Sequence, residues 1–200
     1  MGLKLDFRPG QTPLSEEERG GLKIKSITTR QELDEFEQKN IEIAVEWSDR
    51  QPCSLNNFLT EKFVKKLHQK MLGQVWQWAG QFRLSDKSIG IDARLIPVAL
   101  RQLLDDCRYW LDNKVFSEEE IAIRLSHGLV KIHPFVNGNG RHSRLMADIM
   151  MVHIFKRPLF SWGGLNLEEI NSERSFYIKA LKKADEGDFS ALLFFAKTGS

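Results

Sequence analysis

One short stretch, residues 133–144, brings together a histidine, a glycine-rich turn and two arginines. A proline follows His133 and disfavours a helical residue before it, so the imidazole, which can take up a proton near neutral pH, is expected at a helix break. The turn Gly138–Gly140 permits positive φ angles and leads into a helix start, where free backbone N–H groups favour phosphate. Arg141 and Arg144 are three residues apart and reach the same side of that helix, so the stretch predicts a nucleotidyl- or phosphoryl-transfer site.

The plainer interpretation of these residues is a tight corner between two helices with a capped helix start. We favour the chemical site because a histidine, a proline, a phenylalanine and two spaced arginines accompany the glycines. Phe135 is expected to pack into the core and hold the loop. Motifs of the usual rival sites, such as the P-loop, the His-Glu-x-x-His zinc helix and the Gly-x-Ser-x-Gly elbow, do not occur. His127, His142 and His153 lack ligand-like companions and are expected to be surface or hydrogen-bonded interior side chains.

Two apolar helical segments flank the stretch and must position it. Before it, the capping box Ser117–Glu120 starts a helix that carries apolar residues at spacings of three and four and ends at His133. After it, residues 145–155 are almost all apolar, which predicts a buried helix at the centre of the protein.

Further helices are expected around this pair. They run over roughly 29–48, started by a second capping box, over 59–72, from Pro97, from Asn166, from Ser172 to about Asp185, and from Asp188. The first of them is indicated by the near-helical spacing of Leu33, Phe36, Ile43, Ala44 and Trp47. The fold class is therefore all-α, a helical bundle around a buried central helix, with one small β-hairpin as its only sheet structure.

Residues 75–92 have a different pattern, with short alternating runs on either side of a polar turn. This pattern predicts a two-stranded hairpin, which is stable only when it packs on helices or pairs with another segment. Its free edge could accept an extended peptide as a further strand. A surface loop without a role is the alternative.

Composition sets limits on the class of protein. The chain has 200 residues, 42% of them hydrophobic, and a net charge of +2, which gives no prior for nucleic acid or an anionic membrane. No apolar run is long enough to span a membrane, and the first residues do not resemble a signal peptide. Cys53 and Cys107 do not form a Cys-x-x-Cys pair and suit small buried thiols in a reducing cytoplasm. Residues 1–27 are expected to be an extended arm with at most one short helix.

The stretch from His133 to Arg144 resembles the signature His-Pro-Phe-x-[Asp/Glu]-Gly-Asn-Gly-Arg-x-x-Arg of the Fic/Doc (Fido) family. The resemblance covers about residues 57–197 and includes Trp-Ala-Gly-x-Phe-Arg at 78–83, which is similar to the entry of the family's flap hairpin. Residues 10–14 and 37–47 resemble the subgroup called mobile mystery protein B. This resemblance implies an N-terminal arm and helix over 1–56 and a Fido domain over 57–200.

The resemblance implies a protein adenylyltransferase, which moves AMP from ATP to a hydroxyl of a target protein. His133 would deprotonate the hydroxyl, and Gly138, Asn139 and Gly140 would hold the phosphates, with Asn139 orienting the α-phosphate. Arg141 and Arg144 would bind the β- and γ-phosphates. Lys87, Ser88, Ile89 and Gly90 would form the flap that docks the target segment. Asn137 stands where the family has the acidic ligand of Mg²⁺; its neutral amide oxygen can still ligate the metal but contributes no charge.

The family's phosphate-transferring branch and a catalytically weak nucleotide-binding or interaction module remain alternatives on the same fold. Gly140 favours AMP transfer, because that branch resembles Asn-Lys-Arg at this point. The family's inhibitory motif, [Ser/Thr]-x-x-x-Glu-[Gly/Asn], has no match in the chain, and Thr28–Glu32 is the candidate for a degenerate version. A partner protein could supply the inhibitory glutamate instead, or the chain is not inhibited in this way. A toxin-like or regulatory role and an oligomer are compatible with the sequence.

Overall fold

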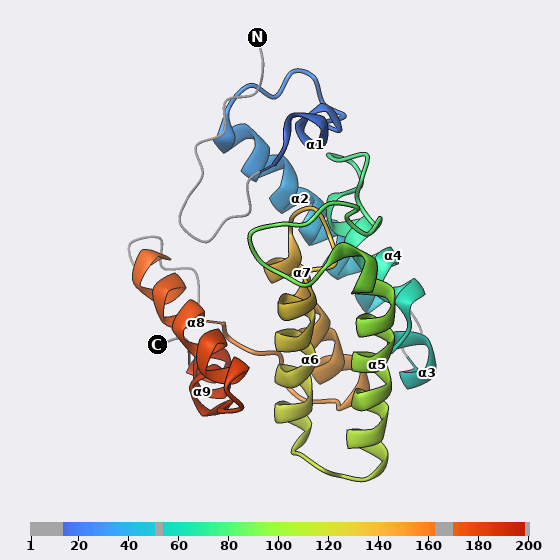
Figure 1. Cartoon of the computed structure of the whole chain (residues 1–200), viewed down its shortest axis with the longest axis vertical. Coiled ribbons are helices and arrows are strands. Elements are labelled where there is room, and N and C mark those ends of the chain that lie inside the picture. Colours follow the sequence, from blue (N-terminus) through green and yellow to red (C-terminus); the bar gives the residue numbers. More distant parts are fainter. Residues whose placement is uncertain (1–13, 51–53, 163–169, 199–200) are drawn as a thin grey trace.

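This computed structural model describes residues 14–50, 54–162 and 170–198 of the protein. All regular secondary structure in these ranges is helical. No strand occurs in these ranges (Figure 1). The helices are α1 (Glu16–Gly20), α2 (Arg30–Asp49), α3 (Leu55–Phe58), α4 (Glu61–Leu72), η1 (Ala93–Leu95), α5 (Ile96–Asp112), α6 (Glu118–Ile132), α7 (Asn139–Ile149), the π-helical turn η2 (Met150–Ile154), α8 (Ile170–Asp185) and α9 (Ser190–Thr198). The all-α prediction is confirmed for these residues.

Helix α2 begins at the capping box expected from the sequence. The Thr29 hydroxyl accepts from the Glu32 N–H, and the Glu32 carboxylate accepts from the Thr29 N–H. The buried face of α2 consists of Leu33, Glu37, Asn40, Ala44 and Ser48, whereas Phe36 and Ile43 are 39% and 44% exposed. Three of these buried residues are polar. Glu37 meets partners in the site described below, and Asn40 and Ser48 bond to backbone carbonyls of their own helix.

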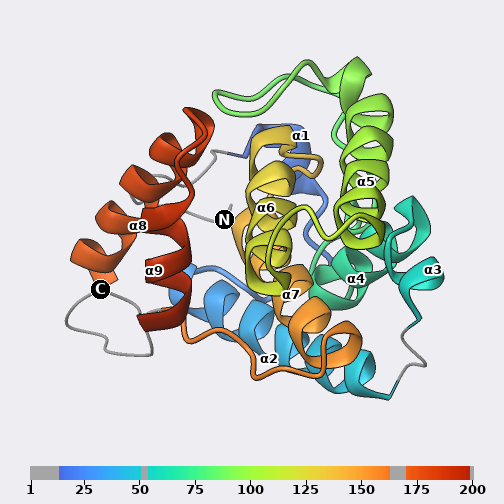
Figure 2. The ribbon, with the colours of Figure 1, turned by 90° about the horizontal axis from the view of Figure 1, so that it is seen from below.

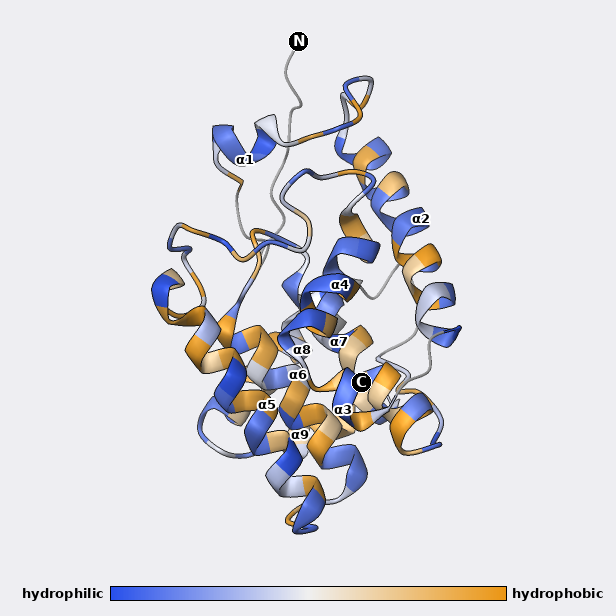
Figure 3. Ribbon diagram, turned by 90° about the vertical axis from the view of Figure 1, so that its right-hand side faces the viewer, coloured by the Kyte–Doolittle hydropathy of each residue, from blue (hydrophilic) through white to orange (hydrophobic). Residues whose placement is uncertain are grey.

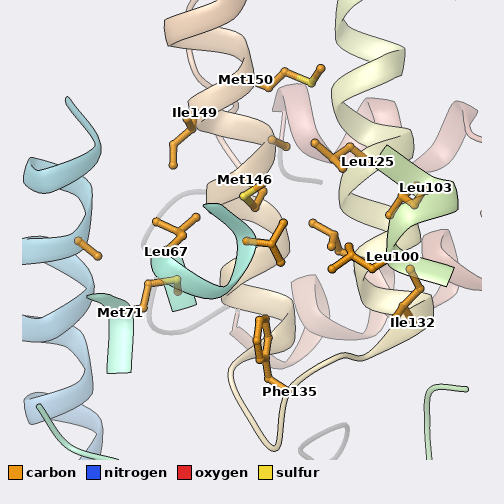
Figure 4. Close-up of a cluster of buried hydrophobic side chains, with 14 of the residues drawn as sticks. Leu67, Met71, Leu100, Leu103, Leu125, Ile132, Phe135, Met146, Ile149 and Met150 are labelled. Atoms are coloured by element: carbon orange, nitrogen blue, oxygen red, sulfur yellow. The ribbon is translucent and has the colours of Figure 1, made fainter. Parts of the chain in front are cut away.

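Helices α6 and α7 hold the signature stretch between them. Ser117 caps α6, and α6 ends at His133 in the left-handed conformation, as the following proline requires a break there. Helix α7 packs against α6 and α4, and its apolar residues continue through the π-helical turn η2. Figure 4 shows the cluster of buried side chains between these helices, which includes Leu67 of α4, Leu125 of α6 and Met146 of α7.

The remaining helices surround this centre. Helix α5 packs on one side of α6, and α9 packs on its other side together with α8 (Figures 1 and 2). Helix α5 displays both hydrophobic and hydrophilic surfaces, whereas the short α1 is almost wholly hydrophilic (Figure 3) and contributes no buried residue. The helical segment expected from Asn166 begins outside the described residues. None of the described helices combines the length and the hydropathy needed to cross a membrane.

The hairpin expected over 75–92 is not confirmed, since this segment contains turns and two isolated bridges rather than strands. One bridge joins Trp76 to Leu22 of the N-terminal arm, and the other joins Phe82 to Phe135 of the signature loop. Both bridges lie in the first half of the segment, which therefore pairs with other parts of the chain and not with the second half. The alternating pattern of residue types therefore did not lead to the predicted hairpin, because strand formation depends on the partners that the segment meets.

Candidate active site

His133 lies at the C-terminal end of α6 with φ 53° and ψ 59°, a conformation that a residue with a side chain seldom adopts. The residue is 6% exposed. Burial, and secondly the positive charge of Arg83, lower the pKa of its imidazole from 6.5 to about 4. The ring is therefore neutral at neutral pH and carries a nitrogen lone pair that can accept a proton.

The loop after His133 is closed by Asn139. Its Oδ1 accepts from the Phe135 N–H at 2.9 Å, and its Nδ2 donates to the Phe135 carbonyl at 2.8 Å. Phe135 itself is fully buried, as expected. Because the side chain of Asn139 is 3% exposed and bonded at both ends, it shapes the loop, and the Asn139 backbone N–H is the group at the helix start.

The glycine-rich turn has one left-handed residue rather than several. Gly138 has φ 78° and caps α7, whereas Asn139 and Gly140 already belong to the helix. A Cβ on Gly138 would lie 2.7 Å from Leu72 Cδ1, but a Cβ on Gly140 would meet nothing within 4 Å. The anion site offered here is thus the open N-terminal turn of α7, with its unbonded N–H groups and positive dipole end.

His68 of α4 supports this loop from behind and was not expected from the sequence. Its Nδ1 accepts from the Gly80 N–H at 2.9 Å, so its Nε2 carries the proton and donates to the Asn137 carbonyl at 2.9 Å. The ring stacks on Phe135 with centroids 3.7 Å apart. Burial holds the pKa of His68 well below 6.5, which keeps this tautomer neutral. The only signal in the sequence was a histidine among the apolar residues of an expected helix.

Glu37 is a second residue to which the sequence assigned no role in the site. Its Oε2 accepts from Arg141 Nη2 at 2.6 Å, and its Oε1 accepts from Trp76 Nε1 at 2.7 Å. The Glu37 side chain is 3% exposed, and that of Arg141 is 34% exposed. The detectable signal was a glutamate at the helical spacing of Leu33 and Ala44, on the face that turns inward.

Arg144 lies one helical turn beyond Arg141 and has different neighbours. Its guanidinium is 5.6 Å from the ring centroid of Tyr177 of α8, and no ion pair to it occurs among the described residues. The candidate inhibitory segment Thr28–Glu32 has another role, because the Glu32 carboxylate accepts from the Thr28 and Thr29 N–H groups at the start of α2. The glutamate of this helix that meets a signature arginine is therefore Glu37.

Asn137 is half-buried, and its Oδ1 accepts from the Gly138 N–H at 2.6 Å. No group of three or more histidine, cysteine, aspartate or glutamate side chains is placed to hold a metal among the residues with described positions. A single neutral oxygen that already accepts a hydrogen bond does not fit a Mg²⁺ site built by the protein alone.

Of the four residues expected to dock a target, Gly90 lies directly beside His133. Lys87 forms an ion pair with Glu18 of α1 at 2.5 Å, and both side chains are largely buried. Ser88 and Ile89 are exposed. Gly90 has φ 100°, and a Cβ there would lie 2.6 Å from His133 Cβ, so the flap segment passes directly over the histidine.

Three other histidines and a cysteine behave as the sequence predicted. His127 and His153 bond to Asp185 and Asp49, and His142 bonds to the Val64 carbonyl, each at 3.0 Å. Cys107 is buried, which raises its pKa to about 12, and Cys53 lies outside the described residues. These groups therefore contribute to packing rather than to the site.

These features define a helical protein with a buried neutral histidine directly before an anion-binding helix start that carries two arginines. A model of the Fic/DOC family matches residues 58–151. The matched span includes His133, the glycine turn and both arginines. The assignment to the mobile mystery protein B subgroup stays a prediction.

Curated relatives carry the name protein adenylyltransferase Fic. The chain is 26% identical to the one from Aedes aegypti over 191 residues, which are 93% of this chain and 37% of that protein. It is 30% identical to the one from Drosophila virilis over 141 residues, 68% of this chain and 27% of that protein. The chain therefore spans only about a third of the length of these relatives.

Solved structures show the same fold at low identity. The chain matches Fic-1 (residues 134–508) from C. elegans with a TM-score of 0.65 and 21% identity, over 88% of this chain and 51% of that one. It matches BepC from Bartonella tribocorum, solved with bound AMPPNP, with a TM-score of 0.64 and 17% identity, over 90% of this chain and 95% of that one. At these identities the likeness concerns the fold alone.

Proposed function

We propose that this protein is a nucleotidyltransferase that moves AMP from ATP to a Ser, Thr or Tyr hydroxyl of a target protein. The observation that carries the proposal is the neutral imidazole of His133 at the entrance to the open helix start of α7. The names of the curated relatives support the same activity. In this reaction the protein contributes mainly positioning, proton removal and charge neutralisation.

In the proposed step, an imidazole nitrogen of His133 accepts the proton of the target hydroxyl. The hydroxyl oxygen forms a bond to the α-phosphorus, and the bond from that phosphorus to the bridging oxygen breaks. Pyrophosphate leaves, and AMP remains on the target. The lowered pKa of His133 keeps the ring unprotonated before the step, so every molecule begins with a base in place.

The phosphates would lie at the N-terminal turn of α7. The backbone N–H groups of Asn139 and Gly140 belong to the first turn of the helix and would bind them, and a Cβ on Gly140 would meet nothing within 4 Å. Arg141 and Arg144 would neutralise the β- and γ-phosphates from the next turns of the helix. Asn139 would act on the α-phosphate through its backbone, since its side chain is bonded to Phe135.

The target segment would dock along Lys87, Ser88, Ile89 and Gly90, which pass over His133. We keep Mg²⁺ in the proposal as a cation carried by the ATP phosphates beside Asn137, and no step above passes through it. An inhibitory partner protein, a toxin-like or regulatory role, an oligomeric state and a cytoplasmic location belong to the proposal as expectations from the sequence.

The test is a pair of reactions with ATP labelled at either the α- or the γ-phosphate, using a cell lysate as the source of targets. The wild-type protein and His133→Ala are compared, with His153→Ala as the matched control outside the site. AMP transfer predicts protein label from α-labelled ATP alone, lost in His133→Ala and retained in His153→Ala. Protein label from the γ-phosphate alone would contradict AMP transfer and favour the phosphotransferase alternative.

A further inference from the structure

Arg83 is a fully buried arginine at the start of the flap segment, and the function proposed above assigns it no task. The residue is 2% exposed. Its guanidinium donates to backbone carbonyls on two sides. Nε donates to His133 O at 2.7 Å, while Nη1 donates to Ser85 O at 2.9 Å and Nη2 to Ile91 O. One side chain thus bonds the carbonyl of the base and both limbs of the flap.

Backbone contacts reinforce the same connection. The Arg83 N–H donates to the Pro134 carbonyl at 3.0 Å, and the Ile91 N–H approaches the Ile132 carbonyl at 3.5 Å. Phe82 and Phe135 form an antiparallel bridge beside them. The flap therefore attaches to the histidine loop at both of its ends, with Arg83 at the junction.

The charge of Arg83 is balanced mainly by carbonyl dipoles. The nearest carboxylate oxygen belongs to Asp86, at 3.6 Å, and that side chain is 72% exposed, so water screens the pair. A guanidinium presents five N–H donors in fixed directions within one plane, so it can donate to several carbonyls that lie on different sides of it. A lysine ammonium would keep the charge but could not reach carbonyls on both sides in this geometry.

This arrangement bears on the backbone of His133, which has φ 53°. Such a conformation persists only when the surrounding structure fixes it. His133 N–H donates to the Leu129 carbonyl, and the His133 carbonyl accepts from Arg83, so both sides of the residue are held. Loss of the Arg83 contact would free the carbonyl side of His133 and the flap together.

We propose that Arg83 is a positioning residue that fixes the flap and His133 as one rigid unit, so that a docked hydroxyl is aligned with the base. This inference rests on the proposed function, because it assumes that the flap docks the target and that His133 is the base. Arg83 holds the backbone of the flap and of the base and is not one of the proposed phosphate-binding groups, so its loss should leave ATP binding unchanged.

The test compares the wild type with Arg83→Lys, and uses Arg108→Lys as the matched control. Arg108 also donates to a backbone carbonyl, that of Leu59, and lies outside the site. With α-labelled ATP and lysate proteins, we expect the maximal rate of AMP transfer by Arg83→Lys to fall about 100-fold, the scale of a misplaced reacting group. The KM for ATP and the affinity for AMPPNP should stay within about twofold of the wild type, since no phosphate-binding group is touched.

Hydrogen exchange provides a readout that does not depend on activity. In Arg83→Lys, peptides covering 82–92 and 132–135 should lose protection together, while the interior of α6 and the control variant keep theirs. If the wild-type protein transfers no AMP, the proposed function fails. The exchange result still decides whether Arg83 holds the flap and His133 together. Loss of protection in the flap alone, or in neither peptide, would overturn the inference.

A second variant tests the same proposal if the Arg83→Lys protein does not fold. In Gly90→Ala, the new Cβ would lie 2.6 Å from His133 Cβ and 2.9 Å from Arg83 Nη2, so it forces the flap away from both residues. The same fall in the rate of AMP transfer, with AMPPNP affinity retained, is expected. An unchanged rate of AMP transfer in either folded variant would show that Arg83 and the flap do not position the base. A loss of AMPPNP affinity equal to the loss of rate would show the same.

Discussion

Glu37 and Arg141 are 104 residues apart in the chain, yet Glu37 Oε2 accepts a 2.6 Å hydrogen bond from Arg141 Nη2. The carboxylate is buried and also bonded to Trp76, whereas about a third of the Arg141 side chain is exposed. A guanidinium has five N–H donors, and this contact uses only one of its ends. The geometry therefore suits a carboxylate that orients Arg141 toward an anion.

Glu37→Gln is the variant that tests this orientation. The amide oxygen can still accept from Trp76, but the charge-assisted bond to Arg141 is lost, and such bonds contribute about 1.5–3 kcal/mol. We expect a lower melting temperature and weaker AMPPNP binding, measured by thermal unfolding and calorimetry. Tighter binding or a higher rate of transfer would instead identify Glu37 as a group that blocks the site.

Gly138 and Gly140 form a matched pair for separating folding from function. Gly138→Ala should destabilise the protein by about 1–2 kcal/mol or more, because Ala is strained at φ 78° and its Cβ meets Leu72. Gly140→Ala lies within a helix and should raise stability by about 0.5–1 kcal/mol. Its Cβ enters the open side of the proposed phosphate site, so AMPPNP affinity should fall. Denaturant unfolding and calorimetry on both variants check this, and unchanged affinity in Gly140→Ala would place the phosphates elsewhere.

The buried imidazole of His142 should make the free energy of unfolding depend on pH. Burial lowers the pKa of His142 from 6.5 to about 4, so between these values the unfolded chain binds a proton that the folded protein does not. Stability from this group is present above pH 6.5 and is lost as the pH falls toward 4, by about 3 kcal/mol in all. Unfolding measured from pH 7 to 4 should show this decline, with a smaller slope in His142→Gln. An equal slope in both proteins would contradict the assignment.

Asn137→Asp tests whether a missing charge limits metal binding. A carboxylate at this position would add one negative charge beside the phosphates, and Mg²⁺ favours anionic oxygen ligands. We expect Mg²⁺ to increase the affinity for AMPPNP more in the variant than in the wild type. Calorimetry with Mg²⁺ or with a chelator measures this difference. An identical Mg²⁺ effect in both proteins would show that position 137 does not contact the metal.

The positions of helices α2 and α6 could be predicted from the sequence because helix caps and prolines act on residues close to them in the chain. Thr29 and Ser117 cap the helices that they were expected to start, and the proline after His133 ends α6 at the expected residue. The segment 75–92 was different. Its residues bond to Leu22 and to the signature loop, and these are partners distant in sequence that no local pattern specifies.

The signature stretch was visible in the sequence, but its supports were not. His133, Arg141 and Arg144 were found by residue type and spacing. Glu37 of α2 and His68 of α4 each form one hydrogen bond to the signature stretch, to Arg141 and to the Asn137 carbonyl respectively. In a linear sequence each is one polar residue in an amphipathic helix, and only the packing of α4 on α2 and α7 gives it a partner.

The central claim is that the protein transfers AMP to protein hydroxyls with His133 as the base. Peptide mass spectrometry of proteins from cells that express either the wild type or His133→Ala tests it most directly. The expected result is AMP attached to Ser, Thr or Tyr side chains with the wild type, and none with His133→Ala at equal abundance. Modified peptides that carry phosphate instead of AMP, or no modification although the purified protein binds ATP, would contradict it.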